Sequence, residues 1–219
     1  MIKKYVTPSL LNVQKDQRIE MAKTLISEGI EWIHYDVMDG KFVPNTAIQL
    51  EEIIEIKKIA PQHFMDAHLM VENPLDYIDK FKDVVDIVTI HYEATSNDEL
   101  LSFLKDNYHE CRIGLAIKPA TSVSEIQELL PYLSLVLVMS VEPGAGGQKF
   151  IPTALEKISL LKNIRSKNQY QFLIQVDGGI NDSTGPQSFK AGADACVAGT
   201  FLIKSPVKDT INSIINNKL

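Results

Sequence analysis

Leu135-Val136-Leu137-Val138-Met139 is an apolar run in which neither face of an extended chain would carry a polar side chain. Because successive side chains of a strand point to opposite sides, a strand of this composition must be covered on both faces. Strands of this kind are typical of parallel sheets that lie beneath helices. The run therefore indicates an α/β fold.

Similar short runs recur along the chain and predict eight strands, near residues 5–9, 32–37, 63–70, 87–91, 112–117, 133–140, 172–177 and 193–198. Amphipathic segments with the period of an α-helix lie between them, among them 15–28, 73–81, 122–130 and 152–164. In the first of these, Ile19, Ala22 and Leu25 share one stripe, and Gly29 follows as a C′ glycine would. Eight strands alternating with helices favour a (β/α)8 TIM barrel, and an open doubly wound sheet is the alternative. We find no linker and no repeat, so we predict a single domain over residues 1–219.

Composition limits the classes of partner. The 219 residues, 45% of them apolar, can bury one large core, and a formal net charge of −6 argues against nucleic acid and against anionic membranes. Cys111 and Cys196 lack CxxC spacing and predict buried, reduced thiols. The first residues lack the apolar core of a signal peptide, and no run is long enough to span a bilayer. We expect a cytoplasmic protein.

Polar side chains that can bind a metal or a substrate fall where the predicted strands end, namely Ser9, His34, Asp36, His68, His91 and Asp177. In a barrel these ends open on one face, where catalytic residues gather. His34 and Asp36 are two residues apart, so on a strand both side chains point the same way and make half of a divalent metal site.

His68 and Asp177 would supply the other two ligands. Each of the four alone is more simply an ordinary polar strand end, but their convergence favours a metal. His91 either lines the pocket or forms a local hydrogen bond that braces the rim. His63 and His109 are interpreted as solvated residues without a role.

Glycines form a second group, in segments that follow three adjacent predicted strands: Pro143-Gly144-Ala145-Gly146-Gly147-Gln148, Asp177-Gly178-Gly179-Ile180 and Ala198-Gly199-Thr200. Glycine lets backbone N–H groups approach an anion closely, and the last two loops of a barrel commonly bind phosphate. Tight turns are the simpler explanation for any one segment. Three together predict a phosphate site built from amides, which an acidic protein can contain.

At these residues the sequence resembles the ribulose-phosphate 3-epimerase family, from Ser9 to about Thr200. The most specific match is the segment from His34 to Asn45, His-Tyr-Asp-Val-Met-Asp-Gly-Lys-Phe-Val-Pro-Asn. Shorter matches follow in the family's order: Pro8-Ser9, Asp66-Ala67-His68-Leu69-Met70-Val71, Val138-Met139-Ser140-Val141-Glu142-Pro143-Gly144 and Val176-Asp177-Gly178-Gly179-Ile180.

The resemblance implies a ribulose-phosphate-binding barrel that is an isomerase of carbohydrate metabolism and the pentose phosphate pathway. One divalent cation (zinc, iron(II) or manganese) would be held by His34, Asp36, His68 and Asp177. Asp36 and Asp177 would be the acid/base pair. A phosphorylated ketose would be bound by Ser9, His68, the Gly144–Gly147 loop with Ala145, Gly178, Gly179, Gly199 and Thr200. Met38, Met70 and Met139 would form an apolar collar over its reacting carbons.

Epimerisation beside a ketone removes a proton from one face of a carbon and returns one to the other. Two groups on opposite faces are needed, because a single base tends to return the proton to the face that it left. The intermediate is an enediolate, whose charge a cation stabilises. Metal contact and a dry, methionine-lined pocket would set the protonation of the aspartates.

The sequence departs from the family at three positions. Ala145 stands where an aromatic residue is usual, Lys118-Pro119 stands where Asn-Pro is usual, and Thr200 replaces a more usual serine. Ala145 would exclude less water if its loop closes over the substrate. The Lys118 amino group would contact substrate or point to solvent.

Interconversion of D-ribulose 5-phosphate and D-xylulose 5-phosphate is the function we predict. The alternatives are a D-allulose 6-phosphate 3-epimerase, a phosphate-binding barrel lyase or decarboxylase, and a non-catalytic phosphosugar-binding protein. Lyases of this fold generally need a lysine among the strand-end acids, and none lies within His34-Tyr35-Asp36. We expect a homo-oligomer, as is common in the family. The sequence leaves open the preferred sugar, the native metal and which aspartate is the base in each direction.

Overall fold

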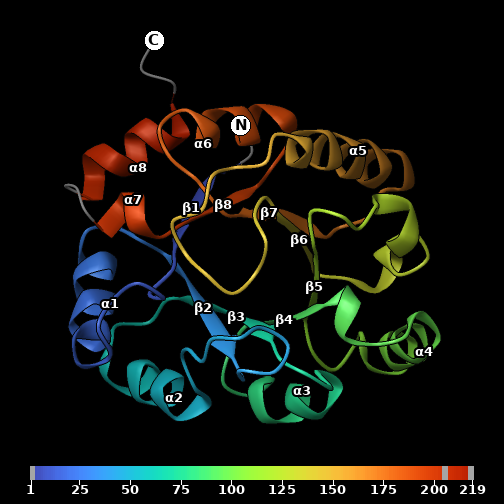
Figure 1. Ribbon diagram of the computed structural model, residues 1–219, viewed down its shortest axis with the longest axis horizontal. Coiled ribbons are helices and arrows are strands. Elements are labelled where there is room, and N and C mark those ends of the chain that lie inside the picture. The colour runs from blue at the N-terminus through green and yellow to red at the C-terminus, as the bar shows by residue number, and fades with distance from the viewer. Residues whose placement is uncertain (1–2, 204–206, 217–219) are drawn as a thin grey trace.

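Eight parallel strands surrounded by helices make up the computed structural model, which describes residues 3–203 and 207–216 (Figure 1). The strands are β1 (Tyr5–Pro8), β2 (Trp32–Met38), β3 (Phe64–Met70), β4 (Ile87–His91), β5 (Ile113–Ile117), β6 (Leu135–Met139), β7 (Leu173–Asp177) and β8 (Ala195–Ala198). They are hydrogen bonded in the order β1-β8-β7-β6-β5-β4-β3-β2. A single parallel bridge between Ser9 and His34 joins the two ends of this order, so the sheet is a nearly closed barrel rather than an open sheet.

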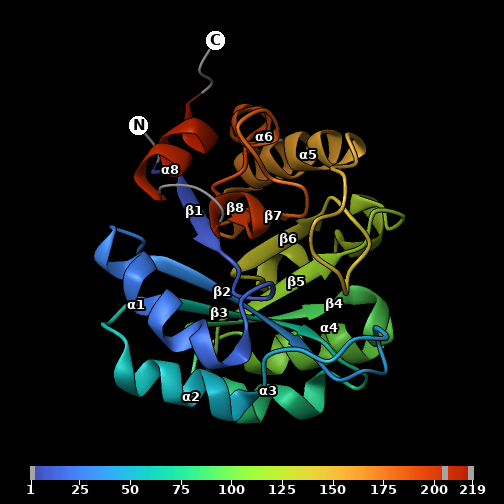
Figure 2. The ribbon, with the colours of Figure 1, turned by 60° about the vertical axis from the view of Figure 1, so that its left-hand side comes forward.

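Every predicted strand is present, and its ends differ from the prediction by about two residues at most. The helices are α1 (Arg18–Ser27), α2 (Leu50–Ile59), α3 (Leu75–Phe81), α4 (Asn97–Asn107), α5 (Thr153–Asn168), α6 (Thr184–Ala191), α7 (Thr200–Ile203) and α8 (Val207–Ile215). They cover the outside of the barrel, and α8 lies beside β1 and α6 (Figure 2). Gly29 follows the end of α1 with a φ of 98°, as predicted for a C′ glycine.

The helix predicted over 122–130 is wrong in type. Two short 3₁₀ helices, Val123–Ile126 and Leu130–Tyr132, replace it. The Ser122 and Glu125 side chains form a capping box at the start of the first of these helices. Pro131 has no N–H to donate, so the segment between Ser122 and Pro131 leaves room for only about two helical turns.

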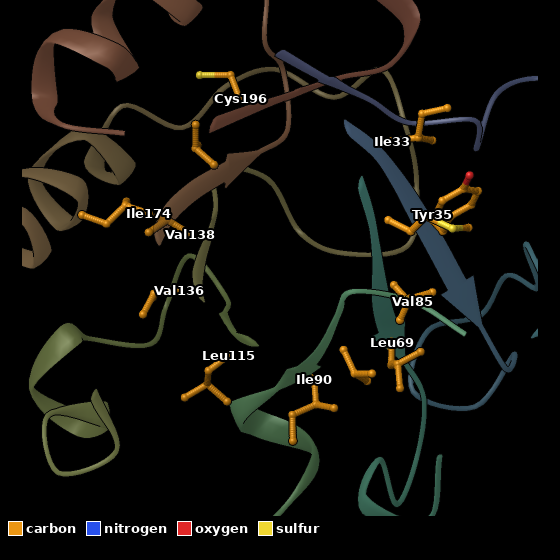
Figure 3. Packing of buried hydrophobic residues seen from close by; sticks show 14 of the residues in the cluster. Ile33, Tyr35, Leu69, Val85, Ile90, Leu115, Val136, Val138, Ile174 and Cys196 are labelled. Carbon is orange, nitrogen blue, oxygen red and sulfur yellow. The ribbon is translucent and has the colours of Figure 1, made fainter. Parts of the chain in front are cut away.

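The alternation of each strand divides the core into two layers. Side chains such as Ile33, Tyr35, Leu69, Val138 and Ile174 belong to the larger layer and form a ring around the barrel beneath the helices (Figure 3). Leu135, Leu137 and Met139 belong to a second cluster inside the barrel. Both faces of β6 are therefore buried, as the apolar run predicts.

One sheet with its helices accounts for the described residues, while positions 1–2, 204–206 and 217–219 of the predicted domain lie outside them. Cys196 is buried as predicted, whereas Cys111 is only half-buried; both are free, and burial raises the pKa of each thiol. No helix in the described ranges combines the length and apolar character that crossing a bilayer requires.

Candidate metal centre and active site

A cavity of about 800 Å³ opens at the carboxyl ends of the strands. It is lined by most of the predicted site residues, namely Ser9, Asp36, Met38, Met70, Met139, Gly144, Ala145, Gly146, Gly147, Asp177, Gly178, Gly179, Gly199 and Thr200. His34 and His68 lie beneath its floor and are fully buried. The structure therefore brings the two predicted groups, the metal-binding side chains and the glycine loops, to one cavity.

The four predicted metal ligands converge. One ligand atom from each of His34, Asp36, His68 and Asp177 lies within 4.8 Å of the others. Nδ1 of His68 is 3.3 Å from Oδ1 of Asp36 and 3.9 Å from Oδ2 of Asp177. Nε2 of His34 is 3.5 Å and 4.0 Å from the same two carboxylates.

The strand register explains this convergence. Asp36 lies opposite His68 in the β2–β3 pair, and His34 lies two residues earlier on the same inward face of β2. Asp177 ends β7, which approaches from the other side of the barrel (Figure 1). The hydroxyl of Ser9 donates a hydrogen bond to Asp36 from the end of β1, which orients that carboxylate.

Two nitrogen atoms at the centre carry the case for a metal. Within the described chain, Nε2 of His34 and Nδ1 of His68 are buried without a hydrogen-bond partner. Leaving a buried polar atom unpaired costs about 1–3 kcal/mol. Both atoms face the two carboxylates, and two imidazoles with two carboxylates suit zinc, iron(II) or manganese. The residues therefore fit one divalent cation.

The two carboxylates have opposite pKa shifts. Burial alone would raise the pKa of Asp36, but the charge of the neighbouring His34 imidazole outweighs it and lowers that pKa. Burial, together with the nearby charge of Asp36, raises the pKa of Asp177 to about 7. About one-fifth of the Asp177 side chain is exposed, whereas Asp36 is nearly covered.

His34 is supported from deeper in the barrel by a residue to which the sequence analysis assigns no role. Its Nδ1 is 2.7 Å from Oδ2 of the buried Asp66, and the Trp32 indole donates to Oδ1 of the same carboxylate at 2.7 Å. Nδ1–H therefore faces the carboxylate, which leaves Nε2 for the metal. The signal was available: Asp66 is two residues before His68, on the same face of its strand.

His68 is supported at the rim by His91, which forms the local hydrogen bond that was one of the two predicted roles. Nε2 of His68 is 2.8 Å from Nε2 of His91, and Nδ1 of His91 is 3.1 Å from Oε2 of Glu93. Burial lowers the pKa of His91 to about 4. Glu93 also accepts hydrogen bonds from the backbone N–H of Lys118 and the hydroxyl of Thr121. Glu93 is the second residue that the sequence analysis missed.

His63 links strands instead of standing free in solvent. Its Nδ1 contacts the Pro61 carbonyl at 2.7 Å, and its Nε2 contacts the Tyr35 hydroxyl at 2.7 Å. This side chain is half-buried and lies away from the cavity. His63 directly precedes β3, as an element-start residue would, but it is half-buried rather than freely solvated, and no functional role follows from its contacts.

The glycine loops form the opposite wall of the cavity. A Cβ on Gly179 would lie 2.5 Å from the backbone nitrogen of Phe150, so only glycine fits there. A Cβ on Gly146 would meet the side chain of Asn12, which donates a 2.8 Å hydrogen bond to the Thr200 hydroxyl. Asn12 thus ties the loop after β1 to the start of α7, a link that no pattern in the sequence indicated.

The three predicted methionines all line the cavity, but they belong to two clusters. Met38 and Met70 pack together with Val43, whereas Met139 packs with Val141 inside the barrel. Their side chains face the space above the metal ligands from two sides.

Two of the three departures from the family, Ala145 and Lys118, differ in position. Ala145 is exposed and lines the cavity. Within the described part of the chain, Lys118 does not line this cavity. Its ammonium lies 4.3 Å from the centre of the Phe42 ring. The amino group stacks on an aromatic ring, a contact that neither predicted alternative included, and its contact with substrate stays a prediction.

Comparison with known proteins supports one family. The model of the family described as "Ribulose-phosphate 3 epimerase family" matches residues 5–203. A ribulose-phosphate 3-epimerase of Eremothecium gossypii is 38% identical over 99% of this chain and 94% of its own. Those of Treponema pallidum and Aquifex aeolicus are 35% and 39% identical, over 94% and 83% of this chain and 94% and 81% of theirs.

Solved structures support the fold. A 3-hexulose-6-phosphate synthase superposes with a TM-score of 0.62 at 18% identity, covering 97% of this chain and 98% of its own. The DAHP synthase of Thermotoga maritima superposes with a TM-score of 0.64 at 15% identity, covering 90% of this chain and 60% of its own. At these identities the likeness extends to the barrel alone.

Proposed function

The chain belongs to the ribulose-phosphate 3-epimerase family, and from that membership we propose that it interconverts D-ribulose 5-phosphate and D-xylulose 5-phosphate. The observation that carries the proposal is the pair Asp36 and Asp177, two carboxylates of opposite pKa shift within one cluster of ligand atoms. Without a bound cation, one carboxylate is ionised near neutral pH, whereas the pKa of the other, about 7, lets it take up and release a proton. An epimerase that works with two groups needs this combination of a base and an acid.

We propose that Asp36 and Asp177 exchange a proton with C3 of the substrate from its two faces. The reaction runs in both directions, so the two residues exchange roles with the direction. Ser9 keeps Asp36 oriented through its hydrogen bond. His34, Asp36, His68 and Asp177 would hold a divalent cation. When bound, the cation supplies positive charge that stabilises the negative charge developing on the substrate oxygens.

We further propose that the phosphate lies against the backbone N–H groups of the glycine segments and of α7. The first N–H groups of a helix have no acceptor within the helix, and α7 begins at Thr200 directly after Gly199. Gly144, Ala145, Gly146 and Gly147 would contribute from the loop after β6, and Gly178 and Gly179 from the loop after β7. His68 would contact the sugar from below, and Met38, Met70 and Met139 would exclude water from the reacting carbons.

The test follows the proton at C3. Ribulose 5-phosphate incubated with zinc- or iron-loaded protein in deuterated buffer should incorporate deuterium at C3, and xylulose 5-phosphate should form. Absence of both with metal-replete protein would leave phosphosugar binding as the better description. A higher kcat/KM for D-allulose 6-phosphate would favour the six-carbon substrate instead.

We also propose that the protein is a homo-oligomer in the cytoplasm, as expected from the resemblance to its family. Light scattering coupled to size-exclusion chromatography measures the mass of the particle directly. A particle with the 24.5 kDa mass of one chain at assay concentrations would contradict an oligomer.

A further inference from the structure

His68 has an unusual pair of neighbours for a buried histidine. Its Nδ1 faces Asp36 and Asp177, and its Nε2 is 2.8 Å from the Nε2 of another fully buried imidazole, that of His91. Two nitrogen atoms at this distance share one proton, because two lone pairs or two N–H groups would repel each other. Which ring supplies the proton decides whether Nδ1 of His68 is a lone pair or an N–H.

Glu93 decides which ring supplies this proton. It is the third member of the hydrogen-bonded series His68–His91–Glu93, which we call the relay. Its Oε2 is 3.1 Å from Nδ1 of His91, and a carboxylate there accepts a proton from that nitrogen. A neutral His91 with its proton on Nδ1 has a lone pair on Nε2. It must therefore accept the hydrogen bond from His68, whose proton lies on Nε2 and whose Nδ1 is free.

The position of Glu93 is fixed by a third layer of contacts. Its Oε1 accepts hydrogen bonds from the backbone N–H of Lys118 at 2.7 Å and from the hydroxyl of Thr121. Lys157 holds the same segment through the carbonyls of Lys118, Pro119 and Thr121 at 2.9, 2.8 and 2.6 Å. The relay thus runs from α5 and the loop after β5, across β4, to β3, which are neighbours in the barrel (Figure 1).

From this geometry we infer that His91 and Glu93 are positioning residues, which hold the proton of His68 on Nε2 so that its Nδ1 faces the metal site as a lone pair. The inference rests on the metal site of the proposed function. The two histidines then carry their protons on different nitrogens, His68 on Nε2 and His34 on the Nδ1 that faces Asp66. The other nitrogen of each ring, Nδ1 of His68 and Nε2 of His34, has no hydrogen-bond partner among the described residues and faces the metal site. Neither His91 nor Glu93 lines the 800 Å³ cavity, so both act through His68 rather than on the substrate.

Nitrogen-15 NMR of the histidine rings in metal-free wild-type protein measures the proton position directly. We expect the proton of His68 on Nε2 and that of His91 on Nδ1. His63 is an internal reference for a proton on Nδ1, because that atom faces the Pro61 carbonyl and its Nε2 faces the Tyr35 hydroxyl. A proton on Nδ1 of His68 would overturn the inference, and this measurement needs no variant.

Glu93→Gln reverses the relay while keeping the shape of the side chain. The amide oxygen is held toward the donors Lys118 and Thr121, so the NH₂ group faces His91 and donates to its Nδ1. His91 then donates from Nε2, and the proton of His68 moves to Nδ1, where it faces the metal site. We expect the Kd for Zn²⁺ to rise about 10- to 100-fold, the usual effect of losing a support behind a metal-binding histidine. The NMR signal of His68 should change to the other tautomer.

Glu72→Gln is the matched control, because Glu72 is an exposed residue of the small cleft that Glu93 and Lys118 also line. It removes the same charge without touching either histidine and should leave the Kd for Zn²⁺ unchanged. Equal Zn²⁺ affinity of Glu93→Gln and wild type would refute the positioning role. Failure of the wild type itself to bind Zn²⁺ would refute the metal site instead, and the NMR measurement separates these two results.

Discussion

The two walls of the cavity are built from different parts of the chain. On the wall formed by β2 and β3, buried side chains converge, and each histidine is backed by a further carboxylate, Asp66 for His34 and Glu93 by way of His91 for His68. On the wall formed by the loops after β6, β7 and β8, glycines bring the backbone close to the cavity, and at several of them a Cβ would collide with a neighbouring atom. We therefore expect activity to be lost when a functional group of the first wall is replaced, and substrate binding to weaken when a methyl group is added to a glycine of the second wall.

The largest expected effect tests sensitivity to chemical group at Asp177, the metal-binding side chain that reaches the ligands of the first wall from the end of β7. Asp177→Asn removes one proposed acid/base group and one metal ligand with almost no change of volume. We expect kcat to fall by about 10³-fold or more, since acid–base catalysis alone contributes roughly 10²- to 10⁴-fold. Asp182→Asn, an exposed position in the loop that follows, should leave kcat unchanged. An active Asp177→Asn enzyme would remove this residue from the mechanism.

A smaller effect tests the steric sensitivity of the second wall, at Gly179. Gly179→Ala would place a Cβ 2.5 Å from the backbone of Phe150, so the loop must shift. We expect KM for the sugar phosphate to rise roughly tenfold, equivalent to about 1.4 kcal/mol of binding free energy.

Gly147→Ala separates steric collision from backbone strain. Gly147 also has a positive φ, 77° against 60° at Gly179, but a Cβ there meets nothing within 4 Å. Its KM should therefore change less than that of Gly179→Ala. Equal KM values for the two variants would show that strain, and not the close approach of Phe150, controls this wall.

Proton competition gives a third test, because the cluster of metal-binding side chains contains groups that titrate near neutral pH. Asp177 has a pKa of about 7, and the charges of Asp66 and Asp36 outweigh burial to raise the pKa of His34 above its usual value. A cation must displace these protons, so its affinity should rise as pH increases from 6 to 8. The change should be roughly tenfold per pH unit for each proton released. Calorimetry in buffers of different ionisation enthalpy counts those protons, and a pH-independent affinity would mean that neither group carries one.

The two walls also differ in how far the sequence predicts them. The four metal ligands and the glycine segments follow from residue type, strand alternation and loop position, and the structure brings them to one cavity. Asp66 and Glu93 were missed because their roles depend on which strands are neighbours and in what register, as in the pairing of His34 with Asp66. The 3₁₀ helices at 123–126 and 130–132 were missed because helical periodicity does not distinguish a short α-helix from a 3₁₀ turn.

The smallest expected effects lie at two of the three positions where the sequence departs from its family, Ala145 on the glycine wall and Lys118 outside the cavity. Ala145 lines the cavity on the glycine wall, where an aromatic side chain is usual in the family. Ala145→Phe adds apolar surface that excludes water from a closed loop, so kcat/KM for the pentulose phosphate should rise about threefold.

Lys118 is linked to the site by its backbone N–H, which any residue except proline would supply to Glu93, while its ammonium stacks on Phe42. Lys118→Asn should therefore change kcat/KM by less than about twofold, within the range of ordinary surface substitutions. A larger change at Lys118 than at Ala145 would mean that charge at the rim, rather than closure of the glycine loop, governs how the sugar phosphate enters.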